Sequence, residues 1–214
     1  MRDQQVLLVA GPSGGGKSEF LRQLRAGTLP EHLVDLLPRG CPEWPVAEAN
    51  NMLKEGWDER RLLASCGAQD RVIFHYDITF VHRRALGYAQ DPFCRSLASA
   101  RELPLIYIKP DLHQLLRQYD GRLEAHRATK SRPHLIWADW VRMPMKRAAL
   151  RREGLPTADV ADLYRSPGFL QKCYAEWEAY LSQLGQLGTT LHLHVLRPEL
   201  SSTEQPSFAE ARHG

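Results

Sequence analysis

The stretch QVLLVAGPSGGGKSEF, residues 5–20, joins an apolar run to a glycine-rich turn and then to an amphipathic pattern. The apolar run at residues 5–10 predicts a buried strand. Residues 17–26 carry apolar side chains at helical spacing and are followed by Gly27, which predicts a helix that ends there. Three consecutive glycines would weaken the start of that helix, so they indicate either a flexible connector or a backbone that must pass close to something.

The residues around the glycines distinguish these two interpretations. Gly11, Gly16, Lys17 and Ser18 match the pattern G-x-x-x-x-G-K-[ST], between an expected strand and an expected helix. In that context successive backbone N–H groups can curl around a phosphate, and the helix N-terminus adds partial positive charge. The lysine would reach the β- and γ-phosphates, and the serine hydroxyl would ligate Mg²⁺. The glycines are therefore expected to allow close approach, not flexibility.

This motif resembles the Walker A motif of the P-loop NTPase superfamily. The resemblance implies a three-layer α/β/α fold and ATP with Mg²⁺ as the bound nucleotide and cofactor. No N-K-x-D guanine-specificity motif is present in the sequence, which favours ATP as the donor. Lys17 is implied to be catalytic. The implied nucleotide-binding residues are Gly11, Pro12, Ser13, Gly14, Gly15, Gly16, Lys17 and Ser18.

Asp77 ends a second apolar run, VIFHYD, and resembles the Walker B acid of the same superfamily. The resemblance implies that Asp77 and Ser18 hold Mg²⁺ and that Asp77 is catalytic. The alternative is an aspartate that caps the turn into the following residues. His75 lies on the same strand face as Asp77 and either orients a substrate or is a satisfied core histidine, while Tyr76 points to the other face.

Strand and helix patterns alternate along the rest of the chain, which predicts an α/β fold with a mostly parallel five-stranded sheet covered on both faces. We expect residues 1–200 to form one domain and residues 201–214 to be a disordered tail. The expected strands are 5–10, 31–37, 71–78, 103–110 and 191–196, of which 31–37 could instead be a short helix. The expected helices are 17–26, 47–65, 91–103, 111–119 and 168–184.

The segment KPDLHQLLRQYDGRLEAHR, residues 109–127, resembles the entry to the lid of nucleoside monophosphate kinases and related small-molecule kinases. Asp111, Arg117, Gly121 and Arg122 occupy the places of its pattern. The resemblance implies a helical lid at about 119–138, closing so that Arg117 and Arg122 contact phosphates during catalysis. A closing flap that brings positive charge and excludes water suits phosphoryl transfer.

The segment from 117 to 152 is strongly basic, with eight Arg and two Lys against three acidic residues, a net of 10 − 3 = +7. A solvated helical surface is the alternative to a lid. Arg117, Arg122, Arg127 and Arg132 recur every five residues, so on a helix they would spiral around it rather than share a face. Binding to a nucleic acid is a further alternative, ranked last because no recognition motif is present.

Other polar residues give weaker indications of chemistry. Asp35 is a candidate general base or a surface acid, and Arg39 after it could hold an anionic substrate. His192 and His194 share a strand face, and a satisfied pair is favoured over a metal site because no third ligand is near. The remaining candidates are Glu48 and Asp58, read as solvent-exposed charges, and Trp137 and Trp140, read as anchors after the lid.

Composition limits the class of protein. The chain has 214 residues and a formal net charge of +3, which by itself implies no nucleic-acid partner. No apolar run approaches the length of a membrane span, so no membrane partner is expected and a cytoplasmic location is the default. The four cysteines form no CxxC pair and are expected to be reduced thiols or core residues.

The sequence hypothesis is therefore a phosphotransferase that uses ATP and Mg²⁺ and acts on a small-molecule hydroxyl or phosphate acceptor. Residues 28–70 lack the arginine-containing acceptor pocket of nucleoside monophosphate kinases, which disfavours a nucleotide acceptor. One alternative is a non-catalytic or slow nucleotide-binding module that signals through a partner. Another is a sulfotransferase-like enzyme, disfavoured because Lys17 and Ser18 together imply a metal-bound triphosphate. Oligomeric state is left open.

Overall fold

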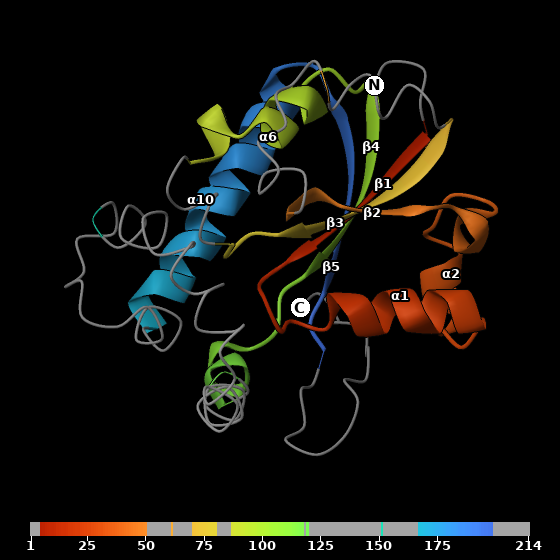
Figure 1. Cartoon of the computed structure of the whole chain (residues 1–214), viewed down its shortest axis with the longest axis horizontal. Coiled ribbons are helices and arrows are strands. Elements are labelled where there is room, and N and C mark those ends of the chain that lie inside the picture. Colours follow the sequence, from red (N-terminus) through yellow and green to blue (C-terminus); the bar gives the residue numbers. More distant parts are fainter. Residues whose placement is uncertain are drawn as a thin grey trace, which may run out of the picture.

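The central feature of the computed structural model is a five-stranded, all-parallel sheet with strand order β2-β3-β1-β4-β5 (Figure 1). The structure describes residues 5–50, 61, 70–80, 87–117, 119, 151 and 167–198. The strands are β1 (Gln5–Gly11), β2 (Val46–Glu48), β3 (Arg71–Asp77), β4 (Glu102–Ile108) and β5 (Thr190–Leu196).

Helices flank both faces of this sheet. The α-helices are α1 (Lys17–Ala26), α2 (Glu31–Val34), α6 (Pro92–Leu97) and α10 (Pro167–Gln186), and the short 3-10 turns are η1 (Cys41–Glu43) and η2 (Tyr88–Gln90). Residues 112–117 are also helical. In Figure 1, α1 and α2 lie on one side of the strands, whereas α6 and α10 lie on the other. No helix within these described ranges is both long and apolar enough to cross a bilayer.

Alternate residues of β1 face two separate cores, because successive side chains of a strand point to opposite faces. One core contains Val6, Leu8 and Ala10 with side chains of α6 and α10, and the other contains Leu7 and Val9 with side chains of α1. A strand buried on both faces explains why residues 5–10 read as a continuous apolar run and not as an alternating one. The helix expected at 168–184 is confirmed as α10, whose buried face comprises Leu170, Cys173, Tyr174, Trp177, Leu181 and Leu184.

The prediction of a strand at 31–37 was wrong, because Glu31–Val34 form the short helix α2. Pro30, in an extended conformation, precedes this helix and its carbonyl accepts the N–H groups of Leu33 and Val34. Of the four helical residues only Leu33 is buried. The apolar residues of this segment therefore do not form the alternating buried face of a strand.

The strand missing from the prediction is β2, which overlaps the start of the range expected to be helical, 47–65. Its three residues form the edge of the sheet and are only half-buried or exposed, so they carry no apolar run. Ala49, Asn50 and Arg61 are helical as expected, and the rest of the range lies outside the described residues. The helix expected at 91–103 is shorter than predicted and ends at Leu97.

The described cysteines, Cys41, Cys94 and Cys173, are buried and form no disulfide with one another, as expected for core residues. Burial raises the pKa of the Cys41 thiol to about 11, because the charged thiolate is disfavoured away from water. At pH 8 only about one Cys41 thiol in a thousand would then be ionised. We expect iodoacetamide at pH 8 to alkylate Cys41 slowly in the native protein and rapidly in urea, as followed by peptide mass mapping. Native alkylation at the rate of a free cysteine would contradict this burial.

Candidate functional site

The glycine loop, which we define as residues 11–16, links the end of β1 to the start of α1. Gly14 and Gly16 have φ values of 74° and 97°, a region that side chains disfavour. Gly16 is also the N-cap residue of α1, and no side chain caps this helix start. The first N–H groups of an α-helix have no partner within the helix, so an anion placed here would accept hydrogen bonds from backbone donors.

Close packing restricts two other glycines of the loop. A Cβ atom built on Gly11 would lie 2.5 Å from the carbonyl oxygen of Ile108 in β4, far inside van der Waals contact. A Cβ atom on Gly15 would lie 3.0 Å from the ring of Pro12, within the same turn. The glycines at these positions therefore allow close approach, as the sequence predicted, and the loop is held tightly against β4.

Lys17 is the first residue of α1, and its side chain folds back over the glycine loop. Its Nζ atom donates to the carbonyl oxygens of Gly11 at 3.0 Å and Pro12 at 2.6 Å, and the residue is only 4% exposed. A buried ammonium group at a helix N-terminus makes this loop electropositive. Ser18, the next residue, is exposed, which leaves its hydroxyl accessible at the mouth of the loop.

Asp77 ends β3 directly beside the glycine loop, since it is paired in register with Gly11. Its Oδ1 atom accepts from both the backbone N–H and the hydroxyl of Thr79, at 2.9 and 2.8 Å. The Thr79 hydroxyl oxygen in turn accepts from the N–H of Ser13 at 2.9 Å. Asp77 therefore caps the turn after β3, as one interpretation of the sequence expected, and it also connects that turn to the glycine loop.

Replacing Thr79 by valine tests this connection. The change keeps the side-chain shape but removes the oxygen between Asp77 and Ser13, so we expect a loss of about 1–2 kcal/mol in the free energy of unfolding. Urea unfolding followed by circular dichroism measures the loss. The matched control is Thr190→Val at the exposed start of β5, which should change stability by less than about 0.5 kcal/mol. Equal effects of the two variants would contradict a structural role for the Thr79 hydroxyl.

A second contact fixes the other side of the loop. The hydroxyl of Tyr119 donates to the carbonyl oxygen of Ser13 at 2.6 Å, across 106 positions of sequence. Tyr119 and Leu115 are buried together with Leu170 and Cys173 of α10, so α10 supports the segment after β4 where it meets the loop. The segment predicted to lead into a lid is thereby brought into contact with the predicted phosphate site.

The arginines expected in the lid are only partly within the described residues. Arg117 is exposed at the end of the 112–117 helix, two positions before the tyrosine that contacts the glycine loop. Arg122 lies outside the described residues, as do all of the lid range 119–138 except Tyr119, and the tail 201–214. Asp111, predicted to begin this segment, caps the 112–117 helix by accepting the N–H groups of His113 and Gln114.

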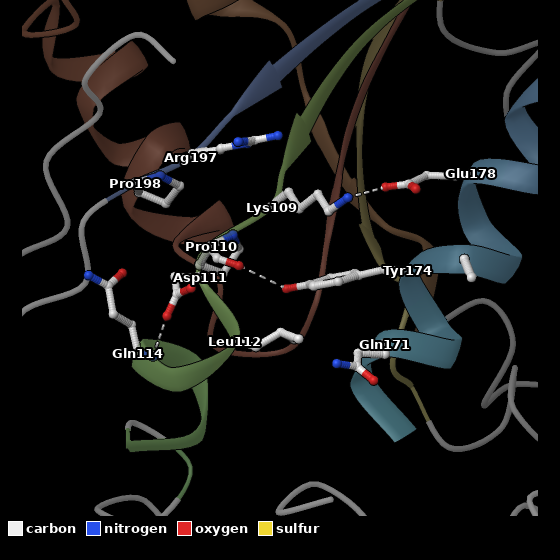
Figure 2. A pocket seen from close by; sticks show the side chains of 11 residues that line it. Lys109, Pro110, Asp111, Leu112, Gln114, Gln171, Tyr174, Glu178, Arg197 and Pro198 are labelled. Carbon is white, nitrogen blue, oxygen red and sulfur yellow. Dashed lines mark hydrogen bonds and ion pairs between the residues drawn. The ribbon is translucent and has the colours of Figure 1, made fainter. Parts of the chain in front are cut away.

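A pocket of about 600 Å³ opens beyond the carboxyl ends of β4 and β5 (Figure 2). Its walls come from the segment after β4, from α10 and from the residues that follow β5. The lining residues are Lys109, Pro110, Asp111, Leu112, Gln114, Gln171, Tyr174, Ala175, Glu178, Arg197 and Pro198. The walls mix charged, amide, aromatic and aliphatic groups, which suits a polar organic molecule.

Lys109 and Tyr174 are held in place within this pocket. Lys109 Nζ lies 2.5 Å from Glu178 Oε1 and 5.4 Å from the centre of the Tyr174 ring (Figure 2). The Tyr174 hydroxyl donates to the carbonyl oxygen of Pro110 at 3.3 Å, and burial raises the pKa of this phenol, so it remains protonated. None of these pocket residues except Asp111 was singled out from the sequence, since they meet only through the pairing of β4 with β5.

The sequence also did not indicate that Glu48 and His75 are partners. Glu48 Oε2 lies 2.6 Å from His75 Nδ1, because β2 and β3 pair with these two residues in register. The expectation that Glu48 is merely an exposed charge is therefore incomplete. Only the strand assignment of residues 46–48 could have revealed the pair.

The remaining candidates lie away from the glycine loop. His192, His194 and Asp35 line a second pocket of about 480 Å³, together with residues at the amino ends of β1 and β4. Burial and the neighbouring His192 lower the pKa of His194. Asp35 follows α2 and not a strand, so it is not the strand-end base that was considered. Among the residues that the structure describes, no group of three or more His, Cys, Asp or Glu side chains could hold a metal ion.

No family model, curated protein or solved structure matches this chain.

Proposed function

We propose that this chain is a P-loop phosphotransferase that binds ATP with Mg²⁺ and transfers the γ-phosphoryl group to a small-molecule acceptor. The observation that carries the proposal is the glycine loop between β1 and α1, with the buried Lys17 ammonium folded over it. Two glycines with positive φ, two at which a Cβ atom would meet tight contacts, and an uncapped helix start fit a cradle for phosphate oxygens.

The topology of the sheet supports the same site. The chain leaves β1 toward β2 on one side of the sheet and leaves β4 toward β5 on the other. Ligands of open α/β sheets bind outside the carboxyl ends of the strands, at the point where the connections reverse direction. The glycine loop and the segment after β4 meet at this point, where Tyr119 contacts Ser13.

Each residue then has a defined role. The backbone N–H groups of Gly14, Gly16 and the first turn of α1, together with the Lys17 ammonium, bind and orient the phosphates, which places the γ-phosphorus for in-line attack. Mg²⁺ would take Ser18 and Asp77 as protein-side groups, with phosphate and water completing its oxygen shell, and would neutralise phosphate charge. Arg117 and Arg122 of the proposed lid would stabilise charge on the transferred group.

The pocket after β4 and β5 suits the nucleoside part of the donor. It begins one strand away from the glycine loop, and its volume and mixed walls fit a base and a ribose. The proposed donor would therefore extend from the loop at β1, across the end of β4, toward Arg197 and Pro198.

The test is transfer of radiolabelled phosphate from [γ-³²P]ATP with Mg²⁺ to a panel of hydroxyl compounds and nucleoside monophosphates. The proposal expects one acceptor class to become labelled and to stimulate ADP release. ATP binding without transfer to any acceptor or to water would favour the nucleotide-binding module instead. Binding of a sulfonucleotide in preference to ATP would favour a sulfotransferase.

A further inference from the structure

The carboxyl ends of β2 and β3 carry a carboxylate–imidazole pair that the roles above do not use. Glu48 Oε2 and His75 Nδ1 are 2.6 Å apart, the distance of a short hydrogen bond. The side chain of His75 is 12% exposed and that of Glu48 is 45% exposed. The pair thus has a largely covered imidazole behind a carboxylate that reaches solvent.

The surroundings of the ring define what it can do. His75 Nε2 is buried, and no hydrogen-bond partner for it is found within the described part of the chain. Only Nδ1 of the ring contacts the carboxylate, so a proton on Nδ1 would be donated to Glu48. The ring is therefore suited to orient Glu48 and not to contact a substrate itself.

The position of the pair relates it to the proposed phosphoryl-transfer site. Asp77 is two residues beyond His75 on the same face of β3, a distance of about 7 Å along the strand. Asp77 in turn lies opposite Gly11, where the glycine loop begins. The Glu48 carboxylate thus lies on the β2 side of the proposed Mg²⁺ site, with the nucleoside pocket on the opposite, β5 side.

We propose that Glu48 is the general base that accepts the proton of the attacking hydroxyl, and that His75 is its positioning residue. This inference rests on the proposed function. In the step, the acceptor oxygen forms a bond to the γ-phosphorus while the bond from that phosphorus to the bridging oxygen breaks. ADP leaves with the electron pair of the broken bond, and the hydroxyl proton moves to Glu48.

A base at this place also narrows the class of acceptor. An alcohol needs to lose its proton as it attacks, whereas a phosphate monoester is already ionised at pH 7 and needs no such base. A carboxylate facing the acceptor also repels a second phosphate. The acceptor is therefore a neutral or cationic compound with a free hydroxyl, such as a sugar or an amino alcohol, and not a phosphate monoester.

The test compares Glu48→Gln with Glu43→Gln, an exposed glutamate five residues earlier that gives the same change of charge. Turnover of Mg·ATP is measured with water alone and with ribose, glycerol, ethanolamine, choline, AMP and CMP. We expect Glu48→Gln to bind Mg·ATP within about twofold of the parent and to lose about 10²–10⁴-fold in kcat. Glu43→Gln should be unchanged, and the hydroxyl compounds should be preferred over AMP and CMP.

The positioning role has its own readout. His75→Val should lower kcat without changing the Kd for Mg·ATP, and His75→Asn, whose amide nitrogen takes the place of Nδ1, should restore most of the loss. Equal defects in the two variants would overturn the positioning role. If Glu48→Gln does not fold, as judged by circular dichroism, Glu48→Asp takes its place. Glu48→Asp retains the charge but shortens the side chain, and it should still lower kcat. An unchanged kcat in Glu48→Asp would overturn the role of Glu48 as general base.

These outcomes separate the inference from the proposed function. Parent-like turnover of Glu48→Gln, in a protein that binds and turns over Mg·ATP, would overturn the role of Glu48 alone. Preferred phosphorylation of AMP or CMP would overturn the inferred acceptor class. A parent chain that binds Mg·ATP but transfers phosphate to neither water nor any acceptor would overturn both proposals, as would a parent chain that does not bind it.

Discussion

Replacing Lys17 by alanine is expected to lower ATP-dependent turnover by at least about 10²–10³-fold and to weaken binding of Mg·ATP. The lysine is the only residue of the glycine loop and its flanks, residues 11–20, with a cationic side chain, and its ammonium is already buried over the loop. Its removal takes away a fixed positive charge that needs no reorganisation when the charge on the γ-phosphate shifts. Steady-state ADP release and isothermal titration calorimetry measure the two effects.

The matched control is Lys172→Ala, since Lys172 is exposed on α10, a helix that lies on the other side of the strands from α1 (Figure 1). This variant should keep the turnover and the affinity of the parent. Lys17 donates to two carbonyl oxygens of the glycine loop, so its removal could alter the conformation of the loop. Thermal unfolding of both variants checks that each remains folded. Equal turnover of Lys17→Ala and Lys172→Ala would contradict the assignment of Lys17.

Replacing Gly11 by alanine is expected to destabilise the whole sheet. The added methyl group would lie 2.5 Å from the Ile108 carbonyl oxygen, which is backbone of the adjacent central strand and cannot turn aside. Relief requires β1 and β4 to move apart, and overpacking of this kind costs about 3 kcal/mol. For a protein of this size, that lowers the melting temperature by roughly 6–12 °C. Differential scanning calorimetry measures the shift.

Gly185→Ala, on α10, provides the contrasting substitution. An added Cβ atom at Gly185 has no neighbour within 4 Å, and the residue is within the helix, where alanine is favoured over glycine. This variant should gain about 0.5–1 kcal/mol. A melting temperature for Gly11→Ala at or above that of the parent would show that β1 and β4 do not approach as closely as described.

Local patterns in the sequence predicted those elements of the fold whose structure follows from the residues of a single segment. Residues 5–10 and 71–78 are buried on both faces of the sheet, so their apolar runs predicted β1 and β3. The glycine loop was predicted because its conformation depends on glycines at fixed positions. The helix α10 was predicted since one of its faces is apolar along its length, packing first on the segment after β4 and then on the sheet.

The features that depend on long-range pairing could not be predicted in this way. Strand β2 is a three-residue edge strand held by β3, and its sequence contains no apolar run. Glu48 and His75 are 27 positions apart and meet only through that pairing. The pocket after β4 and β5 likewise combines residues from three distant segments, and no pattern within any one segment indicates that they meet.

The most direct test of the proposed function is a calorimetric titration of the purified chain with ATP in the presence and absence of Mg²⁺. The account predicts one site per chain, tighter binding with Mg²⁺ than without it, and a marked loss of affinity in Lys17→Ala but not in Lys172→Ala. Absence of ATP binding by the folded parent chain, with Mg²⁺ present, would contradict the assignment of residues 11–18 as a nucleotide-binding loop.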